Sequence, residues 1–246
     1  MARFFVPGNL WCAGSVEFTA SEARHAAQVL RLTAGERVEI FDGSGRAAQV
    51  ELEEVGKRGV TARVLREWHE VRPEPALHLI VALIKNERFD WLVQKATELG
   101  AASLRPVAAE RSVVRLEGKD AAKRRAKWEQ AAVEAAKQCG HLVLPQIFPV
   151  TKPADAFRSA AEGAKGIAAV RAGGCTLGEF FGAGAGAVTF AIGPEGDWTP
   201  EETGQAVAAG FVAVDLGRHV LRSETAALHV LSAAGHVLHG GVGGER

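Results

Sequence analysis

The sequence predicts an α/β protein in which a small, strand-rich N-terminal module precedes a larger, mostly parallel sheet. Short runs of β-forming residues, separated by glycines, fill about the first 70 residues, a pattern typical of a small β-barrel. After residue 76, strand and helix patterns alternate, which favours parallel strands covered by helices on both faces. The segment VRPEPA at 71–76 holds two prolines and is typical of a linker. The expected domains are therefore residues 1–72 and 73–246.

The N-terminal module contains four strand-like runs and one helical run. The strand-like runs are VEFTA at 16–20, ERVEIFDG at 36–43, AAQVELEEV at 47–55 and GVTARVLREW at 59–68. The run SEARHAAQVLRL at 21–32 carries apolar residues at helical spacing, and Ser21 is its expected N-cap.

The C-terminal part alternates apolar runs of strand length with amphipathic runs of helix length. The expected strands are LHLIVALI at 77–84, SLRPVA at 103–108, VLPQIF at 143–148, GIAAV at 166–170, AVTFAI at 187–192 and FVAVDL at 211–216. The expected helices cover 85–100 and 120–138 and begin at Pro153, Thr199 and Ser223.

Composition excludes several classes of protein. The three cysteines, Cys12, Cys139 and Cys175, are scattered with no Cys-x-x-Cys pair, which argues against a disulfide framework or a zinc site, so no metal is expected. No apolar run is long enough to cross a bilayer, and the N-terminus has no signal-peptide pattern, so a cytoplasmic location and no membrane partner are expected. The chain lacks a phosphate-cradling loop for ATP.

Charge is balanced overall but uneven locally. The formal net charge is +0, which argues against a nucleic-acid partner. Between residues 105 and 127, however, eight basic residues stand against three acidic ones. Such a stretch either follows a phosphate backbone or is the solvated face of a helix.

Two glycine-bearing loops follow strands whose carboxyl ends should meet at one edge of the sheet. The first is IGPEG at 192–196, followed by a Thr199-x-x-Glu202 capping box with Pro200 in the first turn. The second is LGRHVLR at 216–222, followed by a helix that Ser223 can cap. In open α/β sheets, ligands bind in loops at this edge, where glycines let the main chain approach them. From the pattern alone, ordinary strand-to-helix connections explain both loops equally well.

In these two loops and in five further blocks, the chain resembles the RsmE family of the SPOUT class. These bacterial enzymes methylate N3 of a uridine in 16S ribosomal RNA. The matching segments are IGPEGDWTPEE, LGRHVLRSETAAL, RFFV at 3–6, HAAQVLRLTAGERVEIFDGSG at 25–45, KNERFDWLVQKATELGA at 85–101, ERSVVR at 110–115 and WEQAAVEAAKQCG at 128–140. The resemblance implies a PUA-like RNA-binding barrel at 1–72 and a SPOUT methyltransferase domain at 73–246, tied in a deep trefoil knot.

The resemblance also implies S-adenosylmethionine as cofactor and assigns site residues. The expected cofactor-binding residues are Ile192, Gly193, Glu195, Gly196, Leu216, Gly217, Val220, Leu221, Arg222 and Thr225. For the removal of the uridine N3 proton, the expected catalytic residues are Arg222 and Glu224, with Glu195 as a second candidate.

The implied partners are 16S ribosomal RNA, within the small ribosomal subunit, and a second copy of the chain in a homodimer. The expected RNA-binding residues are Arg3, His25, Arg31, Lys95, Arg111, Arg115 and Arg124. The alternative from another class is a non-catalytic RNA-binding or ribosome-assembly factor with the same fold.

The sequence departs from the family pattern in a few places. Asp197 stands where the family usually has glycine, and Arg218 and His219 stand where it has proline and arginine. His141 likewise replaces an arginine.

Overall fold

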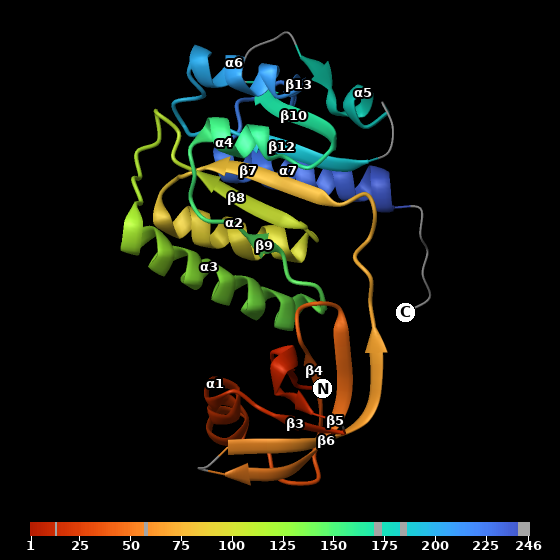
Figure 1. The fold of residues 1–246 in the computed structure, drawn as a ribbon. Coiled ribbons are helices and arrows are strands. Elements are labelled where there is room, and N and C mark those ends of the chain that lie inside the picture. The colour runs from red at the N-terminus through yellow and green to blue at the C-terminus, as the bar shows by residue number, and fades with distance from the viewer. Residues whose placement is uncertain (13, 57–58, 170–173, 183–185, 241–246) are drawn as a thin grey trace. The chain divides into compact units, whose positions relative to one another are not determined.

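A computed structural model describes residues 1–12, 14–56, 59–169, 174–182 and 186–240. The chain divides into two compact units (Figure 1). The N-terminal unit comprises Met1–Arg72 together with Ala136–Leu144, and the C-terminal unit comprises Pro73–Ala135 and Pro145–Arg246.

The N-terminal unit is built on a six-stranded sheet with the order β1-β4-β5-β6-β3-β2. Its strands are β1 (Arg3–Phe5), β2 (Trp11–Cys12), β3 (Ser15–Glu17), β4 (Arg37–Phe41), β5 (Arg46–Gly56) and β6 (Gly59–His69). The β5–β6 pairing shifts register twice, and such bulges bend and twist long strands. The sheet thereby curls around a buried cluster that includes Phe4, Phe18 and Ile40. This agrees with the strand-rich, PUA-like module predicted from the sequence.

The helical run of this unit begins earlier than predicted. Helix α1 (Ala20–Arg24) has Thr19 as its N-cap, and the Thr19 hydroxyl accepts a hydrogen bond from the backbone N–H of Glu22. The prediction of Ser21 as N-cap was therefore wrong: Ser21 lies inside the first turn, and the hydroxyl two residues earlier satisfies the free N–H. The helix continues into one π-turn at His25–Val29.

Residues 136–144 complete the N-terminal unit. Ala136 and Leu142 form a buried cluster with Phe41 and Ala47. Lys137 Nζ lies 2.9 Å from Glu22 Oε1, and both side chains are largely buried.

The C-terminal unit contains a seven-stranded sheet with the order β11-β13-β10-β12-β7-β8-β9, and every pair in it is parallel. Its strands are β7 (Leu77–Ala82), β8 (Ser103–Val107), β9 (Gln146–Ile147), β10 (Gly163–Ala169), β11 (Cys175–Thr176), β12 (Ala187–Ile192) and β13 (Val212–Asp215). Its helices are α2 (Asn86–Glu98), α3 (Gly118–Cys139, which ends in the other unit), α4 (Pro153–Arg158), α5 (Leu177–Gly182), α6 (Pro200–Ala208) and α7 (Ser223–Ala234). The predicted parallel α/β architecture is confirmed.

Helices cover both faces of this sheet, as the alternation of side chains along β7 shows. Leu77, Leu79 and Val81 pack in the cluster that contains residues of α2, α3, α5 and α7. Ile80 and Ala82 point the other way and pack with residues of α4 and α6. The trefoil knot stays a prediction, because strand order and register do not specify whether a chain passes through one of its own loops.

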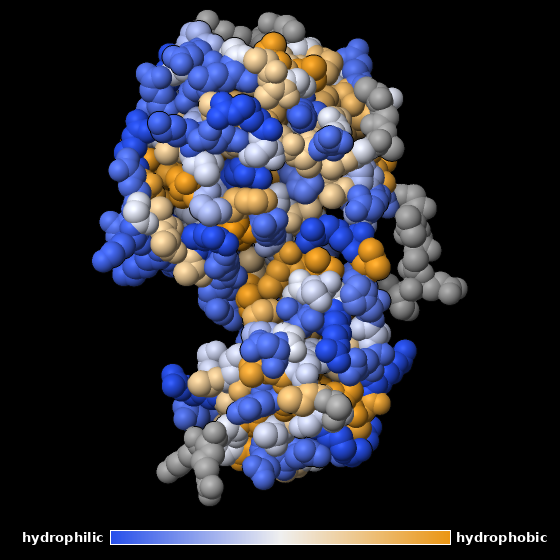
Figure 2. Space-filling model, viewed as in Figure 1, coloured by the Kyte–Doolittle hydropathy of each residue, from blue (hydrophilic) through white to orange (hydrophobic). Residues whose placement is uncertain are grey.

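Hydrophilic side chains dominate the face shown in Figure 2, and hydrophobic ones form small patches among them. Among the residues that the structure describes, no helix is long and apolar enough to cross a membrane.

The capping box of α6 is present as predicted. Thr199 Oγ1 accepts a hydrogen bond from Glu202 N, and Glu202 Oε2 accepts one from Thr199 N at 2.9 Å. The second oxygen of Glu202 accepts a hydrogen bond from the N–H of Glu110 at 2.9 Å. The buried Glu202 carboxylate therefore ties the start of α6 to the segment after β8.

We expect Glu202→Ala to lower the free energy of unfolding by about 2–4 kcal/mol, because two backbone N–H groups lose their acceptor. Urea unfolding followed by circular dichroism measures the loss. Glu202→Gln keeps one acceptor oxygen and should cost less. Equal losses for both variants would contradict this interpretation.

Candidate functional site

The two predicted ligand loops lie at the carboxyl edge of the parallel sheet, after β12 and β13. A hydrogen bond joins them directly: Ser223 Oγ donates to the carbonyl oxygen of Gly193 at 2.7 Å. Ser223 was predicted to cap α7, and that prediction was wrong. The N-cap of α7 is Arg222, without a side-chain cap bond. The Ser223 hydroxyl instead fixes the spacing between the two loops.

A cavity of about 310 Å³ lies between these loops. Its lining consists of Ala168, Ile192, Gly193, Pro194, Glu195, Asp197, Leu216, Gly217, Arg218, His219, Val220, Leu221, Arg222, Ser223 and Ala226. The volume is at the lower end of the range for small-molecule pockets. Of the ten residues predicted to bind cofactor, Gly196 and Thr225 do not line this cavity, and the other eight do.

Two glycines of the lining, Gly193 and Gly217, stand at positions where another residue would be strained. Gly217 has a φ of +112°, a conformation that side chains rarely adopt. A Cβ on Gly193 would lie 3.1 Å from the indole nitrogen of Trp198, tighter than an ordinary contact. Glycine at 217 thus permits the backbone conformation, and glycine at 193 leaves room for the Trp198 ring beside the loop.

Asp197 occupies a left-handed backbone position, with a φ of +61°. Glycine adopts this conformation without strain, and aspartate is among the few other residues that tolerate it. Its Oδ1 accepts a hydrogen bond from Trp198 N at 2.8 Å, which supports the bend. The departure from the family glycine at this position therefore keeps the loop conformation.

Gly196 faces away from the cavity lining toward the segment after β8. Its carbonyl oxygen accepts a hydrogen bond from Arg111 Nη1 at 3.0 Å, and a Cβ on Gly196 would lie 3.1 Å from Arg111 Cβ. Arg111, which does not line the cavity, thus binds the loop at 192–196 through the main chain of that loop.

The two predicted catalytic residues differ in their surroundings. Arg222 is exposed and lines the cavity. Glu224 is buried and does not line it, and its Oε2 has no hydrogen-bond partner among the described residues.

The sequence analysis did not identify Arg88, which contacts both Glu195 and Glu224. Arg88 Nη1 donates to Glu195 Oε1 at 3.4 Å, and Arg88 Nε lies 3.7 Å from Glu224 Oε1. The segment KNERF that contains it belongs to a family block, but nothing in its local pattern indicates contact with either loop.

Among the residues predicted to bind RNA, three lie in the N-terminal unit. Arg3 forms an ion pair with Glu39 at 2.6 Å, and the half-buried His25 ring packs edge-on against Phe4. Arg31 is exposed.

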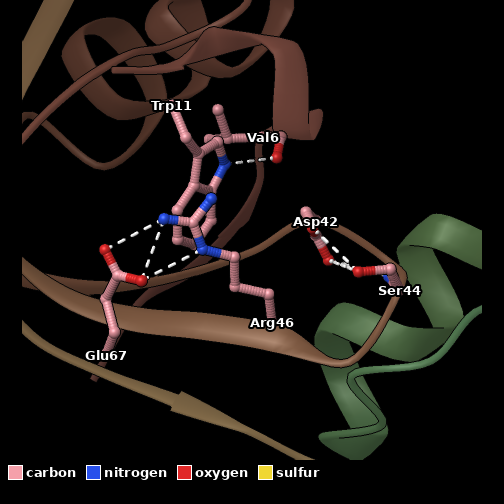
Figure 3. A network of polar contacts seen from close by, with 6 residues as sticks. All are labelled: Val6, Trp11, Asp42, Ser44, Arg46 and Glu67. Atoms are coloured by element: carbon pink, nitrogen blue, oxygen red, sulfur yellow. Dashed lines mark hydrogen bonds and ion pairs between the residues drawn. The ribbon is translucent and has the colours of Figure 1, made fainter. Parts of the chain in front are cut away.

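Arg46, also in the N-terminal unit, is an arginine whose guanidinium has both an aromatic and an acidic partner (Figure 3). Its guanidinium lies 4.3 Å from the centre of the Trp11 ring and makes a forked ion pair with Glu67. The Trp11 indole N–H donates to Val6 O at 2.8 Å.

The other four predicted RNA-binding residues lie in the C-terminal unit, and each has protein partners. Lys95 forms an ion pair with Glu98 at 2.7 Å, and Arg124 forms one with Asp90 at 2.7 Å. Arg115 donates hydrogen bonds to the carbonyl oxygens of Ala109 and Glu110. Arg111 donates to the carbonyl oxygen of Gly196. Arg105, at the start of the basic stretch at 105–127, also has a protein partner. Arg105 stacks 3.7 Å over the Phe148 ring, where burial lowers its pKa.

The chain is similar to known RNA methyltransferases. A family model described as "RNA methyltransferase domain" matches residues 72–235, and one described as "RNA methyltransferase PUA domain" matches residues 18–65. The chain is 34% identical over 240 residues to "Ribosomal RNA small subunit methyltransferase E" of Mycobacterium tuberculosis, covering 96% of this chain and 92% of that protein.

Two similar solved structures contain S-adenosylmethionine. One is the ribosomal RNA small subunit methyltransferase E of Neisseria gonorrhoeae, with 35% identity, a TM-score of 0.87, and coverage of 96% of this chain and 98% of that one. The other is a putative methyltransferase of Legionella pneumophila, with 31% identity, a TM-score of 0.87, and coverage of 96% and 97%. The chain therefore belongs to the ribosomal RNA small subunit methyltransferase E family.

Proposed function

We propose that this protein transfers the methyl group of S-adenosylmethionine to N3 of a uridine in small-subunit ribosomal RNA. The observation that carries the proposal is the cavity between two loops, which a 2.7 Å hydrogen bond from Ser223 to Gly193 joins. Family membership supports the reaction class, and the cofactor-bound relatives support the cofactor.

The cavity fits the cofactor. Its volume of about 310 Å³ and its glycine-bearing main-chain walls suit a flat base recognised by backbone groups. We assign cofactor binding to Ile192, Gly193, Glu195, Leu216, Gly217, Val220, Leu221 and Arg222, which line the cavity. For Gly196 and Thr225, which lie outside the lining, cofactor binding stays a prediction. When bound, the cofactor supplies an electrophilic methyl group on a sulfonium.

The chain must deal with the proton on uridine N3 and with the negative charge left behind. Arg222 is the residue that stabilises this charge, because its exposed guanidinium lines the cavity. Glu224 has a buried oxygen without a partner among the described residues and is the first candidate to accept the proton. Glu224 lies outside the cavity lining, however, and Glu195 lies within it. We therefore keep Glu195 as the second candidate for the residue that accepts the proton.

The Ser223–Gly193 hydrogen bond should contribute to cofactor affinity. We expect Ser223→Ala to raise the Kd for S-adenosylmethionine about three- to tenfold, the equivalent of one neutral hydrogen bond. Calorimetry measures the change. Ser223→Thr keeps the hydroxyl and should bind more tightly than the alanine variant; equal affinities for both would contradict a role of the hydroxyl.

Residues 1–72 form the PUA-like RNA-binding domain in this proposal, and residues 73–246 form the methyltransferase domain. The family models at 18–65 and 72–235 support this division. The RNA contacts are assigned to Arg3, His25, Arg31, Lys95, Arg111, Arg115 and Arg124. The side chains that already have protein partners must give up these partners, or share them with a phosphate, when RNA binds.

A salt titration of RNA binding tests these contacts. Each neutralised phosphate contributes about 0.7 to 0.9 to the slope of log affinity against log salt. We expect Arg31→Ala to reduce the slope by about one such step, because Arg31 is exposed. The double variant Arg46→Gln/Glu67→Gln removes a neutral pair and should leave the slope unchanged. An unaltered slope for Arg31→Ala would remove Arg31 from the RNA contacts.

The finer partner assignments belong to the same proposal. The protein acts in the cytoplasm as a homodimer, on 16S RNA within the small ribosomal subunit. The names of its relatives support the ribosomal substrate. Light scattering coupled to gel filtration tests the dimer, and methylation of naked RNA against assembled subunits tests the substrate.

The alternative, a non-catalytic RNA-binding or assembly factor, is less well supported, because related structures contain the methyl donor. Calorimetry with S-adenosylmethionine separates the two functions. Binding is expected for the enzyme, and its absence would overturn the proposed function.

A further inference from the structure

Arg88 connects three parts of the candidate site that are distant in sequence. It lies in the first turn of α2, and α2 packs beside α7. Its guanidinium reaches Glu195 in the loop after β12, 107 residues further along the chain, and Glu224 in the first turn of α7. One cation therefore contacts an acidic group in the loop after β12 and another at the start of α7.

The two carboxylates have different surroundings. The Glu195 side chain is 37% exposed and lines the cavity, whereas the Glu224 side chain is 10% exposed and does not. Glu224 Oε2 has no hydrogen-bond partner among the described residues, and Arg88 provides a counter-charge at the other oxygen, Oε1. A buried carboxylate without a counter-charge is costly.

Charge in this region bears on one property of a methyltransferase. S-adenosylmethionine carries a sulfonium charge, and its demethylated product, S-adenosylhomocysteine, has lost that charge together with one methyl group. The ratio of their two affinities therefore reports the electrostatic potential that the site presents at the sulfur. The cavity lining contains two acidic side chains, Glu195 and Asp197, and two basic ones, Arg218 and Arg222, so a change of one charge nearby sets the sign of the local charge.

We infer that Arg88 is a positioning residue that binds Glu195 and Glu224 together and, by partly neutralising them, sets how strongly the site prefers the methyl donor over the demethylated product. The inference rests on the proposed function. It adds a role for a residue outside the cavity lining, which acts through Glu195 on product release.

The test measures the Kd of both ligands by calorimetry on the full chain. Arg88→Met removes the cation but keeps an unbranched side chain, and it should raise the donor preference, Kd of product over Kd of donor, by roughly three- to tenfold. Glu195→Gln removes a negative charge and should lower the preference. The double variant should return it toward the wild-type value.

Two controls separate this effect from general damage. Arg88→Lys keeps the charge and should keep the preference near the wild-type value. Arg158→Met changes the net charge as Arg88→Met does, but at an exposed ion pair with Asp155 in α4, outside the lining, and should change nothing.

Each outcome decides the inference. Opposite shifts for Arg88→Met and Glu195→Gln support it. If Arg88→Met weakens both ligands equally, or leaves both unchanged, the inference is overturned and the proposed function stands. If the wild-type protein binds neither ligand, the proposed function fails and the inference fails with it.

Discussion

Arg222→Ala should lower kcat about 100- to 1000-fold and raise the Kd for S-adenosylmethionine much less. A preorganised donor that faces developing negative charge is worth this much in catalysis. Arg222 lines the cavity, its side chain is exposed, and it makes no ion pair within the described part of the chain. Single-turnover methylation of small-subunit RNA, together with calorimetry, measures the two effects separately.

Arg218 provides the matched control for this prediction. It lies four residues earlier, is also exposed and also lines the cavity. Because we assign the stabilisation of the developing charge to Arg222 alone, Arg218→Ala should reduce kcat far less than Arg222→Ala does. If Arg222→Ala retains wild-type turnover with cofactor bound, Arg222 has no catalytic role. A larger loss for Arg218→Ala would move the role to Arg218.

The largest effect on stability is expected for Trp128→Ala, with a loss of about 3–5 kcal/mol. Trp128 in α3 is 1% exposed, and its ring centre lies 4.4 Å from that of Phe89 in α2. Its indole N–H donates to Asp90 Oδ1 at 3.0 Å. The alanine variant leaves a cavity between two helices of the C-terminal unit.

Trp128→Phe separates packing from hydrogen bonding. It keeps a smaller ring against Phe89 and loses the bond to Asp90, which Arg124 and Lys127 still contact. Its expected loss is about 1 kcal/mol. Urea unfolding followed by circular dichroism measures both variants, and a loss below about 1 kcal/mol for Trp128→Ala would contradict the packing interpretation.

Local patterns in the sequence predicted the order of the main strands and helices, because each such element carries its own periodicity and end signals. The Thr199–Glu202 capping box is an example in which every interacting group lies within one turn. The short β11 and α5 were missed. Two residues are too few for a periodic signal in β11, and α5 lacks the proline that marks the start of α4, a helix of equal length.

The two wrong N-cap predictions have a common cause. A serine near a helix start can bond to the helix or to any other partner that the fold brings close. Near Ser21, the hydroxyl of Thr19 takes the capping position. Ser223 finds a carbonyl oxygen 30 residues away in the chain, at Gly193. The sequence shows the hydroxyls but not which neighbours the fold supplies.

Contacts distant in sequence account for what was missed at the site. The resemblance to a known family pointed to both loops, and eight of the ten predicted residues line one cavity. Arg88 was not singled out, because its partners Glu195 and Glu224 come from elements far along the chain. For the same reason the protein partners of Arg111 and Arg124 were not foreseen.

The central claim is that the cavity between the two loops binds the methyl donor, and that its methyl group is transferred to a base. Mass spectrometry of nucleosides tests it most directly. Small ribosomal subunits from cells lacking this enzyme are incubated with the protein and methyl-labelled S-adenosylmethionine, and their RNA is digested. The label is expected in 3-methyluridine. Label in a ribose 2′-O-methyl nucleoside, or no label in RNA, would contradict the claim.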